Sequence, residues 1–173
     1  MVENLKKNSL LLEEIFVFAG VFGFFYEEIF YYFDLGYLVK RGITFGPWIP
    51  IYAFGAILIT LLGWKLRKKP FFFFLLSIFL SGVVEFSTGY VLDHFFHTRL
   101  WDYNVEILNF GNIGGYICFR SVFFFGLSSL FLFYFVIPMF QKINLRFSVK
   151  RLEGIVRILF YSFLFDIILS CIL

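Results

Sequence analysis

The sequence has few of the residues that staple small domains or form common catalytic sites. It contains two cysteines, Cys118 and Cys171, and both lie within apolar runs. A disulfide framework or a zinc site is therefore not expected. The motifs G-x-x-x-x-G-K-[ST], G-x-S-x-G and H-E-x-x-H are also missing, which excludes a phosphate-binding loop and two common hydrolase signatures from this chain. No cofactor and no metal is predicted.

Charge is scarce as well. Charged residues make up 16% of the 173 residues and the net charge is +3, so a nucleic-acid partner is not expected. Hydrophobic residues reach 61%, and 30 residues are Phe. A domain of this length has too small an interior to bury so much apolar surface, and the mean hydropathy of +0.87 is typical of a chain whose solvent is lipid. The sequence predicts an integral membrane protein, with membrane lipid as a partner.

Several apolar runs are long enough to cross a bilayer, which takes about 20 residues of helix. Membrane strands would need alternating polar and apolar residues, and "KKPFFFFLLSIFL" does not alternate. We therefore expect an all-α, polytopic membrane helical bundle, with residues 1–173 as a single transmembrane domain. The second run is short and opens near Pro47 and Pro50, so its start is expected to be extended or re-entrant. The five expected spans are residues 12–33, 49–64, 71–92, 113–137 and 154–173.

The distribution of Lys and Arg predicts how these spans are oriented. With five spans, three basic clusters fall on one side of the membrane: residues 6–7, 65–69 and 142–151. The connections on the other side contain only Lys40, Arg41 and Arg99. Because cytoplasmic loops carry an excess of Lys and Arg, we expect the N-terminus inside and the C-terminus outside.

Charged residues within the expected spans are candidates for function, because each costs about 2.5–3.5 kcal/mol or more near the bilayer centre. Glu27, Glu85, Arg120 and Asp166 all lie about 9–10 Å below the expected outer boundary, at roughly 1.5 Å per residue. Their shared depth predicts a common polar interior. That interior is either a functional site or a purely structural clasp between helices.

A polar connection, residues 92–115, is expected on the outer face above this charged layer. It reads "LDHFFHTRLWDYNVEILNFGNIGG". Trp101 and Tyr103 suit the headgroup level, where Trp and Tyr are enriched. We expect Asp102 and Asn112 to point into a water-accessible vestibule that the connection covers.

Several fragments together resemble a known family. In this sequence they are "GFFYE" at residues 23–27, "KRGITFGPWIPIYAFG" at 40–55, "EFSTG" at 85–89, Trp-Asp-Tyr at 101–103 and "NIGGYIC" at 112–118. Over residues 20–130 the chain is similar to the family known as putative ABC-transporter type IV, small polytopic bacterial membrane proteins labelled ABC transporter permeases. Lys40 and Ala53 depart from the family's pattern, Asn104 replaces a Ser and Phe24 replaces a Trp. Tyr116 stands where the family usually has Arg. Arg120, one helical turn further on, is the candidate to compensate.

The resemblance implies a multi-pass protein of the bacterial plasma membrane with a transport role. Its partner would be a separate nucleotide-binding ATPase subunit, since the chain has no phosphate-binding loop of its own. A substrate would bind at the outer half of the bundle. The candidate substrate-binding residues are Glu27, Arg41, Glu85, Trp101, Asp102, Tyr103, Asn112 and Arg120.

Two other functions stay open from the sequence. Glu27 or Glu85, paired with Asp102, could supply acid–base catalysis on a lipid or lipid-linked substrate at the outer leaflet. Arg41 and Arg120 would then hold its anionic headgroup. Alternatively, the polar layer only locks the helices together, and the chain is a structural or accessory membrane protein. We prefer the transport hypothesis over both, and therefore do not expect an enzyme.

Overall fold

The computed structural model of the protein describes residues 2–146 and 149–172, and over these residues it contains helices and connections but no strand. This confirms the predicted all-α bundle. Two segments depart from α-helical geometry, a 3₁₀ turn (η1) and a π-helical stretch (η2). The elements are α1 (Val2–Leu35), α2 (Pro50–Gly63), η1 (Trp64–Leu66), α3 (Pro70–Phe96), α4 (Phe119–Phe131), η2 (Leu132–Val136), α5 (Ile137–Arg146) and α6 (Val149–Ile172).

Four helical stretches in the described residues are long and apolar enough to cross a membrane: Ser9–Leu35, Pro70–Phe96, Phe119–Leu145 and Leu152–Ile172. Helix α2 has 14 residues, so it covers only about 21 Å of a hydrocarbon layer that is about 30 Å thick. It begins at Pro50, and residues 36–49 before it form no helix. Residues 42–47 form a series of bends, and the chain is extended at Ile49, directly before the helix. The start of this run is therefore not helical, and its two prolines indicated an entry of this kind.

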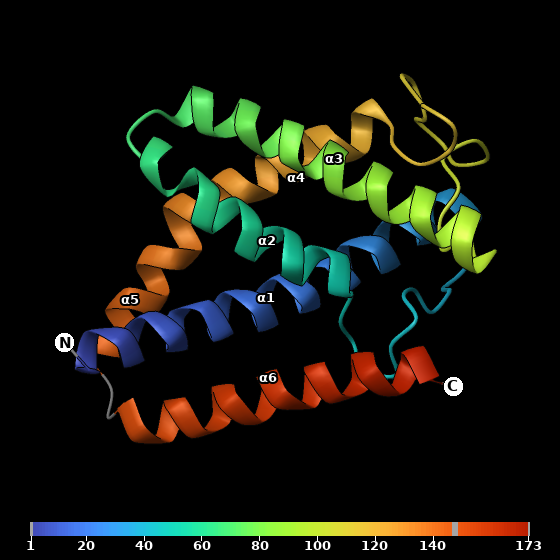
Figure 1. Cartoon of the computed structure of the whole chain (residues 1–173). Coiled ribbons are helices and arrows are strands. Elements are labelled where there is room, and N and C mark those ends of the chain that lie inside the picture. Colours follow the sequence, from blue (N-terminus) through green and yellow to red (C-terminus); the bar gives the residue numbers. More distant parts are fainter. Residues whose placement is uncertain (1, 147–148, 173) are drawn as a thin grey trace.

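The helices lie side by side, and their connections alternate between the two ends of the bundle (Figure 1). The N-terminus, the α2–α3 turn and the end of α5 lie at one end, which we call the basic end. Residues 36–49, residues 97–118 and the C-terminal end of α6 lie at the other, which we call the loop end (Figure 1). Helix α1 packs against both α2 and α6, while α3 packs against α4 and α2.

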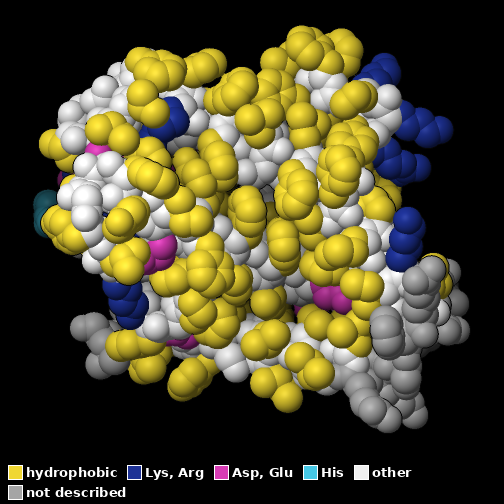
Figure 2. Space-filling view, turned by 180° about the vertical axis from the view of Figure 1, so that it is seen from behind, with side chains coloured by type: hydrophobic (Ala, Val, Ile, Leu, Met, Phe, Trp, Pro, Cys, Tyr) yellow, Lys and Arg dark blue, Asp and Glu magenta, His cyan; other side chains and the backbone are white. Residues whose placement is uncertain are grey.

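Large apolar side chains cover the outside of the bundle. Phe33 and Phe79 are 74% and 67% exposed, and they are two of many such residues. Figure 2 shows hydrophobic side chains spread over one whole face, with Lys and Arg gathered along an edge. An apolar surface of this extent is unusual for a soluble monomer but suits a lipid environment. The molecule is a membrane protein by both its helices and its surface.

Buried side chains are spread along the bundle. Phe73 near the start of α3 is fully buried toward the basic end, whereas the fully buried Phe163 of α6 stacks on Trp48 of the connection at the loop end. The main core cluster joins α1, α2, α3 and the η2 region, and none of its members comes from the two connections at the loop end. Its members are Ile15, Ala19, Ala56, Ile59, Phe73, Leu132, Phe133, Val136 and Ile137.

The fourth long helix begins at Phe119, later than the expected residue 113. The reason is local backbone geometry. Gly111, Gly114 and Gly115 have φ values of +69°, +65° and +81°, which a right-handed helix does not contain. The segment "NIGGYIC" is therefore part of the loop that covers the end of the bundle.

Candidate functional site

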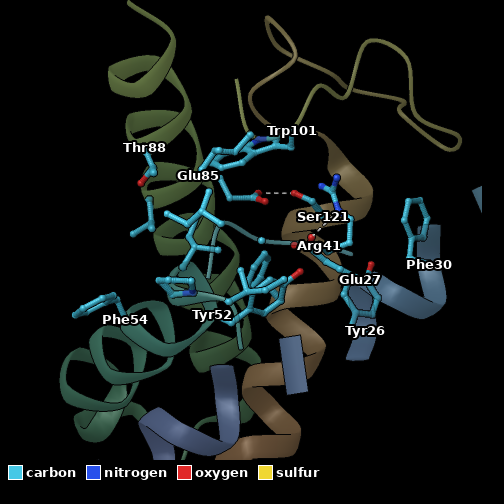
Figure 3. A pocket seen from close by; sticks show the side chains of 18 of the residues that line it. Tyr26, Glu27, Phe30, Arg41, Tyr52, Phe54, Glu85, Thr88, Trp101 and Ser121 are labelled. Carbon is cyan, nitrogen blue, oxygen red and sulfur yellow. Dashed lines mark hydrogen bonds and ion pairs between the residues drawn. The ribbon is translucent and has the colours of Figure 1, made fainter. Parts of the chain in front are cut away.

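A cavity of about 460 Å³ lies at the loop end, within the size range of roughly 300–1,000 Å³ that is usual for ligand sites. Figure 3 shows how side chains from α1, α2, α3, α4 and the two connections converge on it. Most of its lining is aromatic or aliphatic. The charged lining residues are Glu27, Arg41, Glu85, Glu106 and Arg120.

Glu85 reaches the cavity because of a regular pattern on α3. The buried residues of this helix follow one another every four positions: Phe73, Ser77, Ser81, Glu85 and Gly89. Positions i and i+4 share a face, and small residues on such a face let membrane helices approach closely. The stripe packs toward α4, so Glu85 points into the bundle and is only 4% exposed.

The carboxylate of Glu85 is held by two hydroxyl groups. The Tyr103 hydroxyl donates to Oε1 at 2.7 Å, and the Ser121 hydroxyl donates to Oε2. Tyr103 comes from the loop and Ser121 from α4. This carboxylate therefore ties three segments together without an ion pair among the described residues.

Glu27 and its neighbour Glu28 fix the extended segment after α1. Arg41 Nε donates to Glu27 Oε2 at 3.1 Å, while the Arg41 backbone N–H donates to Glu28 Oε1 at 2.9 Å. The Arg41 guanidinium lies 3.7 Å from the ring centroid of Tyr31. Gly42 next to it has a φ of +80°, which lets the chain turn back toward α2.

Arg120 forms the second ion pair of the cavity, with Glu106 of the loop. The Nη2–Oε2 distance is 2.6 Å, and the other oxygen of Glu106 accepts a hydrogen bond from the Tyr31 hydroxyl. The guanidinium also lies 3.8 Å from the ring centroid of Phe30. Both partners are shielded from solvent, with side chains 13% and 4% exposed. Such a pair holds the loop against α1 and α4.

Within the Trp-Asp-Tyr segment, alternate side chains point in opposite directions. Trp101 and Tyr103 line the cavity, and Trp101 Nε1 also donates to the Tyr116 carbonyl at 2.9 Å. Burial, with the nearby Glu85 carboxylate as a second cause, raises the pKa of the Tyr103 hydroxyl well above its ordinary value. Tyr103 thus remains a hydrogen-bond donor at any physiological pH.

Asp102 and Asn112 do not line the cavity, contrary to the sequence prediction. Asp102 pairs with Arg99 at 2.9 Å and accepts hydrogen bonds from the backbone and side chain of Asn104. Asn112 accepts a hydrogen bond from the Gly115 backbone N–H at 2.8 Å. Both residues close the loop on itself. Partial burial acts to raise the pKa of Asp102, but the bonds from Asn104 and Arg99 outweigh it and hold that pKa below its usual value.

Asp166 shares the predicted depth but not the cavity. It lies on α6, is 7% exposed, and faces the extended segment before α2. Its carboxylate accepts hydrogen bonds from the backbone N–H of Phe45 at 2.9 Å, from that of Gly46 at 2.7 Å and from Trp48 Nε1 at 2.7 Å. The predicted charged layer is therefore two separate features, a cavity and an anchor for residues 36–49.

Glu106, Tyr31 and Ser121 contribute to the site but were not predicted from the sequence. Glu106 is the informative case, because it stands in the short apolar stretch "VEIL" of the loop. Its neighbours Val105 and Ile107 are exposed, whereas Glu106 is buried. A loop has no regular alternation of buried and exposed positions, so the sequence does not show that a carboxylate is buried here while its aliphatic neighbours are exposed.

The described residues contain no group of three or more His, Cys, Asp or Glu side chains that could hold a metal ion. The Asp93 carboxylate, close to both histidines in the sequence, instead accepts hydrogen bonds from Arg99 and from the Tyr116 hydroxyl. His94 stacks on Tyr90 with ring centroids 3.9 Å apart.

The fold and the cavity together define a polytopic helical membrane protein with a mostly apolar cavity, lined by a few charged side chains, near one end of the bundle. The model of the family described as Putative ABC-transporter type IV matches residues 14–171, and the chain belongs to this family. The match extends beyond the region in which the sequence motifs were recognised. Neither a curated protein nor a solved structure matches the chain.

Replacing Gly115 with Ala is expected to loosen the loop. Its φ is +81°, and a Cβ atom there would lie 2.4 Å from Asp102 Oδ1 and 2.5 Å from Asn104 Nδ2. Backbone strain and displacement of both side chains should together lower stability by about 2–3 kcal/mol. Gly36→Ala is the matched control, because Gly36 has a φ of +82° with nothing within 4 Å. Thermal unfolding in detergent should show a larger loss of stability for Gly115→Ala than for Gly36→Ala. Equal losses would mean that backbone strain alone, without displacement of Asp102 and Asn104, causes the destabilisation.

Proposed function

We propose that this protein is a permease-like membrane subunit of an ABC transporter and that it binds its substrate in the cavity at the loop end. The observation that supports this proposal is the cavity itself, in a chain that belongs to the family described as Putative ABC-transporter type IV. Charged side chains from α1, α3, α4 and two connections converge there within mostly apolar walls. This combination is the usual composition of a small-molecule site.

The proposal includes an orientation. The basic clusters at residues 6–7, 65–69 and 142–151 belong to segments at the basic end. By the positive-inside rule this end faces the cytoplasm, and the cavity then opens on the outer half of the membrane. The protein would be a multi-pass component of the bacterial plasma membrane.

The energy source would be a separate ATPase subunit that docks at the basic end. The turn between α2 and α3 is a suitable contact, because it is compact and charged. Arg67 lies 5.1 Å from the ring centroid of Trp64, and the Tyr134 hydroxyl donates to the Arg67 carbonyl at 2.9 Å. Lys68 is exposed beside them. A fixed turn with exposed positive charge can bind a complementary acidic surface.

Affinity purification from the cells that naturally produce the protein tests this proposal. The tagged protein in mild detergent should carry a nucleotide-binding subunit in stoichiometric amount, and the complex should hydrolyse ATP. Lys68→Glu should reduce recovery of that subunit by roughly tenfold, since like charges across an interface are strongly unfavourable. Lys40→Glu, the same exposed charge reversal at the loop end, should leave recovery unchanged.

Purification without any nucleotide-binding subunit would contradict the proposal. A lipid-linked molecule recovered in its place would favour the enzyme hypothesis. The geometry does not favour that hypothesis, because its carboxylate pair is not assembled. Asp102 is bound to Arg99 in the loop, and Glu27 is bound to Arg41.

A further inference from the structure

The charges that line the cavity do not balance. Its carboxylates are Glu27, Glu85 and Glu106, and its cations are Arg41 and Arg120. Each arginine is already committed to one carboxylate, Arg41 to Glu27 and Arg120 to Glu106. Glu85 is left without a cation among the residues that the structure describes, although it is the least exposed of the three.

The Glu85 carboxylate still has lone pairs that can accept further hydrogen bonds. Each of its oxygens offers about two acceptor positions, and Tyr103 and Ser121 occupy one on Oε1 and one on Oε2. In Figure 3 the Glu85 side chain projects between Trp101 on one side and Tyr52 on the other, toward Ser121. Burying an ionised carboxylate without a counter-charge is costly. A positive group that enters the cavity would remove that cost.

The walls around Glu85 suit an organic cation better than a hydrated metal ion. Aromatic rings of Tyr26, Tyr52, Trp101, Phe124 and Phe125 line the cavity. The faces of such rings attract ammonium groups, by about 2 kcal/mol or more where water is excluded. Aromatic and aliphatic walls also accept the apolar part of the same molecule.

The cavity reaches the lipid-facing surface of the bundle as well. Phe54 of α2 and Ile43 of the extended segment line it and are 53% and 42% exposed. Cys171 near the end of α6 also lines it and is exposed. Since α2 starts only at Pro50, helix does not close this side at the loop end. A molecule dissolved in the bilayer can therefore approach past these exposed residues, beside the segment that Asp166 holds against α6.

We propose that the cavity binds an amphiphile with a single amine group, whose ammonium pairs with Glu85 while its apolar part lies toward α2 and α6. This inference rests on the proposed function and adds the substrate class to it. The surplus carboxylate selects the cation, the aromatic walls surround it, and the opening toward lipid admits the hydrocarbon chain. Arg41 and Arg120 are each paired with a carboxylate, so an anionic headgroup that approached the free Nε of Arg120 would compete with Glu106.

Calorimetric titration of the protein in nanodiscs, with empty nanodiscs subtracted, tests the inference. The probes are decylamine, decanol and decanoate, which share one chain length and differ in headgroup charge. The wild type should bind decylamine at least about tenfold more tightly than decanol, which corresponds to about 1.4 kcal/mol. Decanoate should bind most weakly.

Glu85→Gln should abolish the preference for decylamine over decanol. Glu153→Gln removes one negative charge at the basic end, where Glu153 pairs with Arg157, and should leave the preference intact. Glu85→Asp keeps the charge but draws it back by one methylene, so it should weaken the preference for decylamine while leaving the binding of decanol unchanged. This variant keeps the test informative if Glu85→Gln does not fold.

Equal binding of decylamine and decanol by the wild type would overturn the inference, because Glu85 would then be neutralised by its own proton. Tighter binding of decanoate would overturn it as well. Neither result affects the ATPase co-purification, on which the proposed function is judged separately. A preference for decylamine that survives Glu85→Gln would place the cation elsewhere in the cavity and would also reject the inference.

Discussion

Replacing Asp166 with alanine should lower the free energy of unfolding by about 3–5 kcal/mol. The Asp166 carboxylate accepts three hydrogen bonds from the extended segment, two from backbone N–H groups and one from the Trp48 indole. Hydrogen bonds to a charged group contribute about 1.5–3 kcal/mol each, and a buried donor left without a partner costs about 1–3 kcal/mol. Lipid offers no replacement acceptor, so the loss cannot be made up by water.

Two further variants test whether the hydrogen bonds of Asp166 cause this loss of stability. Asp166→Asn keeps one carbonyl oxygen as an acceptor and should lose less stability than Asp166→Ala. Asp34→Ala is the control, because Asp34 accepts a single exposed hydrogen bond from the Ile107 backbone at 3.2 Å, and its loss should stay near 1 kcal/mol. Reversible unfolding in detergent measures all three. Equal losses for Asp166→Ala and Asp34→Ala would show that other contacts hold residues 36–49.

The role of Asp166 also explains why sequence reasoning succeeded only in part. Counting residues along each span gives an expected depth, and three of the four residues grouped in this way, Glu27, Glu85 and Arg120, line one cavity. Depth does not give the direction in which a helix turns its side chain. Helix α6 packs against α1. In this packing the face of α6 that carries Asp166 is turned toward residues 36–49 and not toward the cavity.

The loop was harder to predict than the spans. Pro47 and Pro50 correctly indicated the extended entry to α2, because proline restricts the backbone in a known way. Asp102 was predicted inside on the basis of its charge and position above the layer. Its orientation depends instead on Arg99 and Asn104, which close a local network within the loop. Such a network has no period that a sequence pattern could reveal.

Breaking the buried ion pair between Arg120 and Glu106 from either side should be as damaging as losing Asp166. Arg120→Met leaves the Glu106 carboxylate buried without its cation, and Glu106→Leu leaves the guanidinium unpaired. Removing one partner of a buried pair costs about 3–5 kcal/mol, largely through the charge that remains. The partly exposed pair of Arg157 with Glu153 is the control; Glu153→Gln leaves Arg157 its second carboxylate, Glu13, and should cost about 1 kcal/mol or less.

The double variant Arg120→Met, Glu106→Leu tests whether the two residues stabilise the protein through their ion pair or through separate contacts. It leaves no unpaired charge at this position, so its loss should be smaller than the sum of the two single losses by more than about 1 kcal/mol. Unfolding of all four proteins in the same detergent gives this coupling directly. Additive losses would mean that Arg120 acts mainly through its stacking on Phe30 and that Glu106 acts mainly through Tyr31. With coupling, the pair is what holds the loop over the cavity.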